Sequence, residues 1–353
     1  MIPPVVLPLG REALTWVRQG GKPSRAGWPQ QFMLRWQNHW FERNLSLQRQ
    51  LPPARPLHPD PVFILGLWRS GTTYLHDLLS ACPDMIYPAN WQCMSPASFR
   101  LQSSPDKGKT VQRPMDGHTI DNLSPQEDEF ALLALGVPSV YRGFFDPRRL
   151  PELTQWLDPN VWTGNHPVSW IDNWRQFLTG ITDRNPGRLV LKSPNHSFRI
   201  QALAEAFPNA TYVWLVRDPV DTFHSNRKMW LAMFERYALW SWDASLLDDF
   251  LTQAFEFAAE SLGRATRLLS RDHLVVLPFD QLTGATFGSL EGLTRRLSLG
   301  NWHEMQPGVA RVAATKTGYR PEAYHSNLLP GSALKALEKL RLAQHGALSS
   351  HGL

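Results

Sequence analysis

The sequence predicts an α/β fold with a central parallel sheet and helical additions. Continuous apolar runs occur at four places, and such runs are typical of strands that are buried on both faces. Each run is followed by a segment with helical periodicity. Strands that alternate with helices in this way form a parallel sheet through right-handed crossovers. No internal repeat or low-complexity tract interrupts the pattern.

An amphipathic helix is predicted over residues 32–50, before the first strand. Its expected apolar positions are Phe32, Leu34, Trp36, Trp40 and Leu45. Prolines at positions 52, 53, 56 and 59 end this helix. The run PVFILGL at 61–67 then predicts a buried strand, which a glycine-containing turn and a helix follow.

The next part of the chain has a weaker strand signal. Residues 83–119 are rich in Pro, Ser, Asp and Gln and are predicted to be irregular. A helix is predicted from Pro125 to Leu135, because proline is tolerated in the first turn of a helix. The tryptophan-rich segment 156–177 is predicted to cover the active site, as a lid or as a wall of the acceptor pocket.

The second half of the chain alternates between strands and helices. Strands are predicted at 188–192, 211–217 and 273–279, and helices at 198–207, 219–237, 246–269, 287–297 and 333–343. The expected domain organisation is an N-terminal helical extension over 1–60, an α/β domain over 61–330, and a C-terminal helix and tail over 331–353.

Composition limits the possible functional classes. Of the 353 residues, 42% are hydrophobic and 19% are charged, which excludes disordered and fibrous proteins. The 36 Lys and Arg residues exceed the 31 Asp and Glu residues, so an anionic partner is favoured. The densest basic run is the pair Arg295-Arg296, and no nucleic-acid partner is expected. The charge suits a small phosphorylated ligand, and an ordinary basic surface explains it equally well.

The cysteines and the apolar segments indicate the compartment. Cys82 and Cys93 are the only cysteines, too few for a disulfide framework and not spaced as in a zinc ribbon. A reducing compartment is therefore expected. The first residues lack the basic region of a signal peptide, and no window approaches the ~20 apolar residues of a spanning helix. We expect a cytoplasmic protein without a transmembrane segment and leave its oligomeric state open.

The most informative motif lies between the first buried strand and its helix. It reads Gly66-Leu67-Trp68-Arg69-Ser70-Gly71-Thr72-Thr73. The backbone N–H groups of such a turn point inward and the helix N-terminus adds partial positive charge, so the turn is predicted to bind an anion. Gly71 allows close approach of the backbone, and Thr72 and Thr73 add hydroxyl donors. The alternative interpretation is a plain connection between a strand and a helix.

This loop differs at one position from the loop of proteins that bind nucleoside triphosphates. The spacing G-x-x-x-x-G is present, but Thr72 occupies the place of the lysine that contacts the β- and γ-phosphates. The cation is found instead at Arg69, on the other side of the loop.

A second polar cluster follows the strand at 211–217. Arg217 falls at the carboxyl end of this strand, where ligands bind in open α/β sheets. Asp218 and Pro219 begin a helix, and Ser225 lies about two turns along it. Arg217 and Ser225 are predicted to bind a further phosphate, with a salt-bridged helix start as the alternative. Together with the loop, the cluster predicts a ligand that is anionic at two separated points.

These motifs resemble those of the sulfotransferases that use 3′-phosphoadenosine 5′-phosphosulfate (PAPS). RSGTT at 69–73 is similar to the family's 5′-phosphosulfate loop, and RDPVDTFHS at 217–225 is similar to its 3′-phosphate site. LKSPNH at 191–196 and SPQEDEFAL at 124–132 are similar to a bacterial branch of the family. The resemblance runs from about 61 to 230 and continues weakly to KTGYRPEAY at 316–324.

The resemblance implies a P-loop NTPase-like three-layer fold and transfer of a sulfuryl group to a hydroxyl or amine by in-line displacement. It implies PAPS as the donor, 3′,5′-ADP (PAP) as the product, and no metal. By position, Arg69 and Lys192 would contact the 5′-phosphosulfate and the bridging oxygen, and Arg217 and Ser225 would hold the 3′-phosphate. The remaining donor-binding candidates are Ser70, Gly71, Thr72, Thr73, Lys316, Tyr319 and Arg320, of which the last three would close over the nucleotide. Phe279 stands where relatives often have tyrosine.

Acidic residues at a predicted helix start are candidates for the general base. Glu127, Asp128 and Glu129 repel one another, so one of them is expected to accept a proton more readily. Glu127 is expected to share the apolar face and to point inward, with Glu129 next. His196 is the rival base. An acidic first turn that stabilises the helix dipole, or a hydrogen-bonded structural histidine, are the alternatives.

The acceptor and the reaction class leave alternatives open. Aromatic residues in 156–177 and 229–242 predict a partly apolar small-molecule or lipid acceptor, although a sugar that stacks on tryptophan also fits. A kinase with an altered loop would bind ATP with Mg²⁺, and the missing loop lysine argues against it. A non-catalytic protein that retains the nucleotide pocket is the other alternative, and the occupied cationic positions argue against it.

Overall fold

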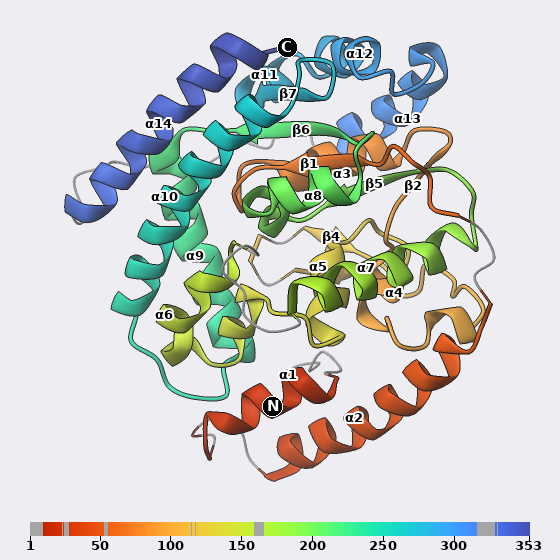
Figure 1. The fold of residues 1–353 in the computed structure, drawn as a ribbon, viewed down its shortest axis with the longest axis vertical. Coiled ribbons are helices and arrows are strands. Elements are labelled where there is room, and N and C mark those ends of the chain that lie inside the picture. The colour runs from red at the N-terminus through yellow and green to blue at the C-terminus, as the bar shows by residue number, and fades with distance from the viewer. Residues whose placement is uncertain are drawn as a thin grey trace. The chain divides into compact units, whose positions relative to one another are not determined.

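The computed structural model describes residues 10–22, 24, 28–52, 56–113, 115–116, 118–158, 166–315, 329 and 331–353. The chain divides into two structural units (Figure 1). The first unit comprises Met1–Leu57, Pro88–Arg184 and Arg227–Phe250, and the second comprises His58–Tyr87, Asn185–Asn226 and Leu251–Leu353. The helices α9 (Pro219–Tyr237) and α10 (Ser245–Leu268) each contribute residues to both units.

The second unit contains the predicted parallel sheet. Its strands are β1 (Val62–Leu65), β2 (Met85–Ile86), β5 (Arg188–Lys192), β6 (Thr211–Val216) and β7 (Leu274–Pro278). Their spatial order is β2-β5-β1-β6-β7, and every neighbouring pair is parallel. The expected central parallel sheet is therefore confirmed, and β2 is the strand that the sequence pattern did not predict.

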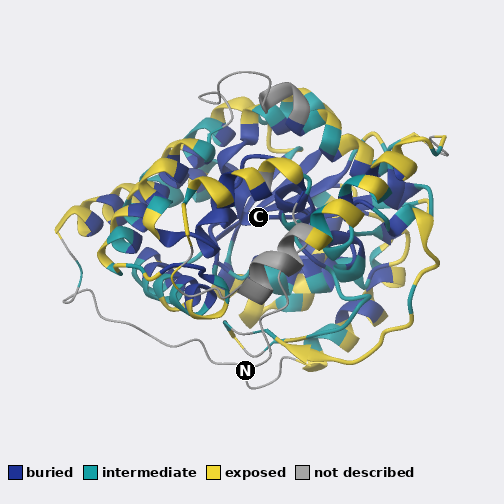
Figure 2. Cartoon of the chain, turned by 90° about the horizontal axis from the view of Figure 1, so that it is seen from below, coloured by how far each residue is buried: buried dark blue, intermediate teal, exposed yellow. Residues whose placement is uncertain are grey.

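The register of the sheet brings three chain segments to one edge. Every residue of β1 and β6 is buried, as the continuous apolar runs predicted. Figure 2 colours the buried residues of the chain dark blue. In β1, Ile64 lies opposite Lys192 of β5 on one side and opposite Val213 of β6 on the other. Because all three strands run in the same direction, the loops that follow them emerge at the same edge of the sheet.

Helices cover both faces of this sheet. The helices of the second unit outside α9 and α10 are α3 (Thr72–Ser80), α8 (Ile200–Ala206), α11 (Phe279–Gly284), α12 (Thr286–Arg296), α13 (Trp302–Thr315) and α14 (Gly331–His351). Val62 and Ile64 of β1 share a core cluster with leucines of α3 and α12 and with Met305 and Val309 of α13. On the opposite face of β1, Phe63 stacks on Tyr212 and packs against Phe207. This alternation is the period of two that a pleated strand imposes.

The first unit is mainly helical. Its helices are α1 (Arg11–Gln19), α2 (Trp28–Arg49), α4 (Asn90–Met94), α5 (Asp128–Ala134), α6 (Leu150–Leu153) and α7 (His166–Thr182), and a two-stranded antiparallel sheet pairs β3 (Val111–Gln112) with β4 (Thr119–Ile120). Aromatic side chains form much of its core. The Phe144 ring lies 4.8 Å from that of Tyr141 and 4.6 Å from that of Trp230, and Trp170 stacks on Trp174 at 5.6 Å.

Several expected elements differ from the structure. The helix predicted from Pro125 begins at Asp128, because Pro125 pairs with Ala89 in an antiparallel bridge. The stretch 83–119 was expected to be irregular but contains β2, α4 and β3. The C-terminal helix runs eight residues further than predicted, to His351, because its sequence after 343 continues without a helix breaker other than Gly346. No helix in the described ranges is long and apolar enough to cross a lipid bilayer.

The helix expected over 32–50 exists, but its faces differ from the expectation. Leu45 is buried, whereas Trp36 and Trp40 are exposed. At 100° per residue, Leu45 lies opposite Trp36 on the helix, so the three side chains cannot share one buried face.

Candidate active site

The turn between β1 and α3 contains two glycines whose backbone conformation few other residues adopt. Gly66 and Gly71 have φ values of 137° and 98°, in the region that favours glycine. Gly71 directly precedes the first turn of α3. A Cβ at this position would lie 2.3 Å from Cδ2 of Phe279, so only glycine fits. The predicted turn between strand and helix therefore exists. Gly71 is required both by its backbone conformation and by the lack of space for a side chain.

Hydrogen bonds from the turn that follows β5 hold the loop in place. The hydroxyl of Ser197 accepts a hydrogen bond from the Gly66 N–H at 2.7 Å and donates one to the Gly66 carbonyl at 3.0 Å. Within the loop, the Ser70 hydroxyl donates to the carbonyl of Leu67 at 2.7 Å. Ser197 lies in the 3₁₀ turn Pro194–Phe198, so the segment that carries Lys192 is tied to the phosphate loop.

Asn226 fixes the other side of the loop. Its Nδ2 donates to the carbonyl of Trp68 at 2.7 Å and to the carbonyl of Thr222 at 2.8 Å. The Trp68 ring is buried and packs on Phe198 at 5.6 Å. Asn226 and Ser197 were not predicted from the sequence, because each acts through a contact with a residue more than 100 positions away in the chain.

Arg69 connects the two predicted phosphate clusters. Its Nε donates to the hydroxyl of Ser225 at 3.2 Å, and its carbonyl accepts a hydrogen bond from Nη1 of Arg217 at 3.2 Å. Arg69 also has a left-handed backbone, with a φ of 68°, which costs a non-glycine residue free energy. The structure thus brings Arg69, Arg217 and Ser225 into direct contact, although they are far apart in sequence.

Arg217 is held by three neighbours besides Arg69. Its guanidinium lies 5.4 Å from the centre of the Phe279 ring and 3.8 Å from Asp221, one helical turn away. Its carbonyl accepts a hydrogen bond from Nε2 of Gln344 in α14 at 3.1 Å. Phe279 therefore contacts both Gly71 and Arg217, which gives this phenylalanine a packing role beside the loop.

Lys192 is buried at the carboxyl end of β5, with only 2% of its surface exposed. His76 of α3 is also buried, and its Nε2 has no hydrogen-bond partner among the described residues. Burial and the positive charge of Lys192 lower the pKa of His76 well below its usual value of 6.5. His76 is therefore neutral near pH 7, so it does not place a second buried positive charge near Lys192.

The low pKa of His76 predicts a pH dependence of stability. As the pH falls below 6.5, the unfolded chain takes up a proton on His76 before the folded chain does. The free energy of unfolding is therefore expected to decrease, by at most about 1.4 kcal/mol per pH unit from this group. Urea unfolding between pH 7.5 and 5 measures the slope. His76→Gln should reduce it, and His303→Gln, at an exposed position, should leave it unchanged; equal slopes in all three proteins would contradict the assignment.

Buried polar atoms around the loop suit a polar ligand. The side-chain amide of Asn195 is 1% exposed, and neither its oxygen nor its nitrogen has a hydrogen-bond partner among the described residues. The same holds for Oδ1 of Asn226. Because buried polar groups are normally paired, a ligand with several donors and acceptors fits this edge of the sheet. Together with the loop N–H groups and three cations, these atoms fit a nucleotide that carries anionic groups.

The candidate general bases lie in both units. Glu127 and Glu129 belong to the first unit and His196 to the second. Glu127 precedes α5 and is half-buried, and the Tyr141 hydroxyl donates to its Oε2 at 2.6 Å. Glu129 is fully buried. Glu127 is the acid expected to point inward, but it is half-buried, whereas Asp128 and Glu129 are fully buried.

Asp128 and His196 are both buried beside aromatic side chains. Asp128 is also fully buried, and its Oδ2 accepts a hydrogen bond from Nε1 of Trp174 at 2.8 Å. His196 has no exposed surface, and its ring lies perpendicular to that of Phe63 at 6.0 Å. The remaining predicted site residues, Lys316, Tyr319 and Arg320, lie outside the described residues.

The chain is similar to proteins of one known family. The model of the sulfotransferase family matches residues 61–304 of the chain, which include the loop, Lys192, Arg217 and Ser225. Omega-hydroxy-beta-dihydromenaquinone-9 sulfotransferase Stf3 is 30% identical over 268 residues, which are 75% of this chain and 69% of the relative. The match is the same for the proteins of Mycobacterium bovis (strain ATCC BAA-935 / AF2122/97) and Mycobacterium tuberculosis (strain CDC 1551 / Oshkosh).

Solved structures show the same fold. Sulfotransferase STF9 from Mycobacterium avium aligns with a TM-score of 0.67 and 18% identity, over 97% of this chain and 92% of its own. Sulfotransferase STF1 from Mycobacterium tuberculosis H37Rv aligns with a TM-score of 0.64 and 18% identity, over 93% of this chain and 90% of its own. The expected P-loop NTPase-like fold is confirmed, and a kinase is not favoured. The chain belongs to the sulfotransferase family, whose general reaction is the transfer of the sulfuryl group of PAPS to an acceptor.

Proposed function

We propose that the donor PAPS binds at the edge of the sheet formed by the 66–73 loop, Lys192, Arg217 and Ser225. The observation that carries this proposal is the contact of Arg69 with both Ser225 and Arg217. One continuous group of cations and donors, built from three separate segments, matches a nucleotide that is anionic at its 3′ and 5′ positions. On binding, the Arg69 side chain would exchange its bond to Ser225 for bonds to the donor.

The roles of the individual groups follow from the charge that develops during sulfuryl transfer. Negative charge grows on the oxygen that bridges phosphate and sulfate as the nucleotide leaves. Arg69, Lys192 and the N–H groups at the start of α3 would stabilise this charge, as the donors of an oxyanion hole do. Fixed cations would then replace a metal ion, and we expect turnover to continue in the presence of a chelator.

For the acceptor, we propose a hydroxyl group on a partly apolar lipid. The relative Stf3 is, by its name, a sulfotransferase of omega-hydroxy-beta-dihydromenaquinone-9, which supports a lipid class. Glu127 accepts a hydrogen bond from Tyr141, whose ring stacks on that of Phe144, so this candidate base lies beside aromatic side chains of the first unit. The two cysteines are buried free thiols, which supports a reducing, cytoplasmic compartment.

The general base is proposed among Glu127, Glu129 and His196. Tyr141 orients the carboxylate of Glu127, and Glu127 is more exposed than the other two candidates, so an acceptor reaches it most easily. We expect Glu127→Gln to lower turnover at saturating PAPS by about 100-fold, because a positioned base contributes 10²–10⁴-fold. Glu129→Gln and His196→Ala test the rivals. Near-normal turnover of all three variants, with unchanged PAP binding, would contradict the proposal.

Transfer of ³⁵S from labelled PAPS tests the proposed function directly. The protein is incubated with hydroxylated isoprenoid quinols, aryl alcohols and sugars, with and without chelator. We expect label in an apolar hydroxylated acceptor and the same rate in chelator. A thermal-shift comparison separates the alternatives, since PAP should stabilise the protein and ATP with Mg²⁺ should not. Stabilisation by ATP with Mg²⁺ but not by PAP would contradict the proposal, and PAP binding without transfer to any acceptor would favour a non-catalytic protein.

A further inference from the structure

The excess of positive over negative charge in the chain is concentrated in its first 57 residues. This segment holds eight Lys and Arg residues and two Asp and Glu residues, whereas the other 296 residues hold 28 and 29. The basic residues are Arg11, Arg18, Lys22, Arg25, Arg35, Arg43, Arg49 and Arg55. The whole net charge of +5 therefore comes from the N-terminal segment, and the rest of the chain is close to neutral.

The helix α2 of this segment carries an exposed apolar face. Trp36, Trp40 and Leu47 are 58%, 40% and 43% exposed. With Arg43 they are spaced four, three and four residues apart, so all four side chains lie on one side of the helix. Large apolar side chains gathered on one exposed face are characteristic of interaction surfaces. We call these four residues the α2 outer face.

The opposite side of α2 is the one that anchors it in the first unit. Phe41, Leu45 and Gln48 are buried. Nε2 of Gln48 donates to the carbonyl of Pro96 at 2.8 Å, and its Oε1 accepts a hydrogen bond from the backbone N–H of Arg100 at 3.0 Å. The apolar residues of the α2 outer face are therefore not needed to attach the helix to the unit.

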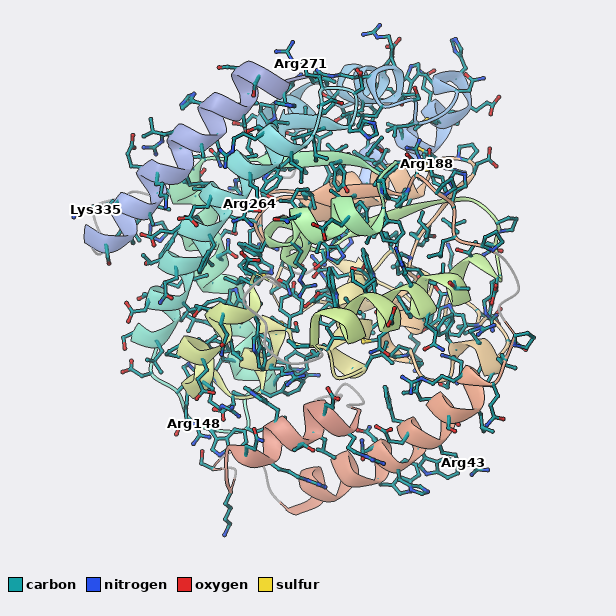
Figure 3. The ribbon with its side chains drawn as sticks, viewed as in Figure 1. Arg43, Arg148, Arg188, Arg264, Arg271 and Lys335 are labelled. Atoms are coloured by element: carbon teal, nitrogen blue, oxygen red, sulfur yellow. The ribbon has the colours of Figure 1, made fainter. Side chains whose placement is uncertain are left out.

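Aromatic and basic groups are combined on the α2 outer face. The Arg43 guanidinium lies 5.2 Å from the centre of the Trp40 ring, and the rings of Trp36 and Trp40 are 6.0 Å apart. Figure 3 shows the Arg43 side chain projecting from α2. The other basic side chains described in the segment, Arg11, Arg18, Lys22 and Arg49, are exposed as well. The face thus combines three apolar side chains with one cation, in a segment whose other described basic side chains are also exposed.

We propose that the α2 outer face docks the protein reversibly on an anionic lipid surface. Tryptophan is favoured at the boundary between headgroups and acyl chains, and leucine is favoured in the acyl layer. Basic residues near the surface are attracted to anionic headgroups. The proposal goes beyond the sulfuryl-transfer activity and does not depend on the acceptor class.

Two other occupants fit the same face less well. In a symmetric contact between two copies, each basic segment would face an equally charged one, and the repulsion would oppose association. A nucleic acid would be matched by several cations that follow its backbone, whereas the α2 outer face has one cation among three apolar side chains. An anionic lipid surface offers headgroups to the basic side chains and acyl chains to the apolar ones.

Vesicle flotation of the full chain tests the proposal. We expect the wild type to float with vesicles of phosphatidylcholine and phosphatidylglycerol, to float poorly with phosphatidylcholine alone, and to dissociate as salt is raised. Trp36→Ser combined with Trp40→Ser should weaken binding by about tenfold or more, because two large apolar side chains lose their contact with lipid. Arg43→Glu should weaken binding to the anionic vesicles. Phe287→Ser, at a 41% exposed aromatic in the other unit, is the matched control and should bind as the wild type does.

Calorimetry with PAP shows that each variant is folded and keeps its donor site, so that a defect in docking is distinguished from a defect in the proposed function. Should the double variant not fold, Arg43→Glu and the salt titration of the wild type still decide. The proposal is overturned if the wild type does not bind the anionic vesicles, or if the variants bind them as well as the wild type. It is equally overturned if the tryptophan substitutions leave vesicle binding unchanged and instead reduce self-association in sedimentation experiments, or instead reduce binding to RNA.

Discussion

Replacement of Lys192 by methionine is expected to lower turnover at saturating PAPS by about 100-fold or more, equivalent to ~3 kcal/mol of transition-state stabilisation. Methionine has a similar length and fits a buried position, so the substitution removes the charge and keeps most of the packing. Lys192 is buried at the end of β5, opposite Ile64 of the strand that leads into the phosphate loop. A buried cation interacts strongly with charge that develops nearby, because the dielectric constant is lower where water is excluded.

The experiment compares initial rates of ³⁵S transfer and the affinity for PAP. Lys339→Met is the matched control, because Lys339 is an exposed lysine that pairs with Glu260 on the surface, where ion pairs contribute little. The control should keep the activity of the wild type. Full activity of Lys192→Met with normal PAP affinity would contradict the role of Lys192 in stabilising the leaving group.

Replacement of Gly71 by alanine is expected to destabilise the protein by about 2–4 kcal/mol and to weaken donor binding by at least about tenfold. The first cause is the φ of 98°, which an L-residue rarely adopts. The second is the distance of 2.3 Å between the added Cβ and Cδ2 of Phe279, whose ring is buried under the Arg217 guanidinium. A shift of Phe279 would therefore also move Arg217. Urea unfolding and calorimetry with PAP measure the two effects.

Gly288→Ala provides the control for this substitution. Gly288 lies in α12, and a Cβ there would meet no atom within 4 Å. Alanine is a better helix former than glycine, so the control is expected to be neutral or up to about 1 kcal/mol more stable. If Gly71→Ala is as stable as the wild type and binds PAP equally well, the close packing of the loop against Phe279 is not a property of the protein.

Much of the second unit could be predicted from the sequence, because its signals are local. The runs at 188–192 and 211–217 are apolar on both faces in their middle, which is typical of strands inside a covered sheet, and they form β5 and β6. The glycines of the loop and Arg217, which directly follows β6, could be placed for the same reason. Parallel strands carry their following loops to one edge, so these residues were expected at the same edge of the sheet, where they would bind a ligand that is anionic at two separated points.

The features that the sequence did not reveal depend on distant contacts. Ser197 and Asn226 look like ordinary polar residues in a turn and a helix, and only the fold brings them to Gly66 and Trp68. The start of α5 was predicted three residues early, because the bridge between Ala89 and Pro125 is not visible in a local pattern. The outward direction of Trp36 could have been found, since its angle to Leu45 on a helical wheel already separates the two faces.

The most direct test of the central claim compares PAP with 5′-AMP, which lacks the 3′-phosphate, by titration calorimetry. We expect the wild type to bind PAP at least about 100-fold more tightly than 5′-AMP, because Arg217 and Ser225 would form charge-assisted and neutral hydrogen bonds to that phosphate. In the double variant Arg217→Ala, Ser225→Ala, the two ligands should bind with nearly equal affinity. Equal affinity for the two ligands in the wild type, or a preference that survives in the double variant, would contradict the placement of the nucleotide on these residues.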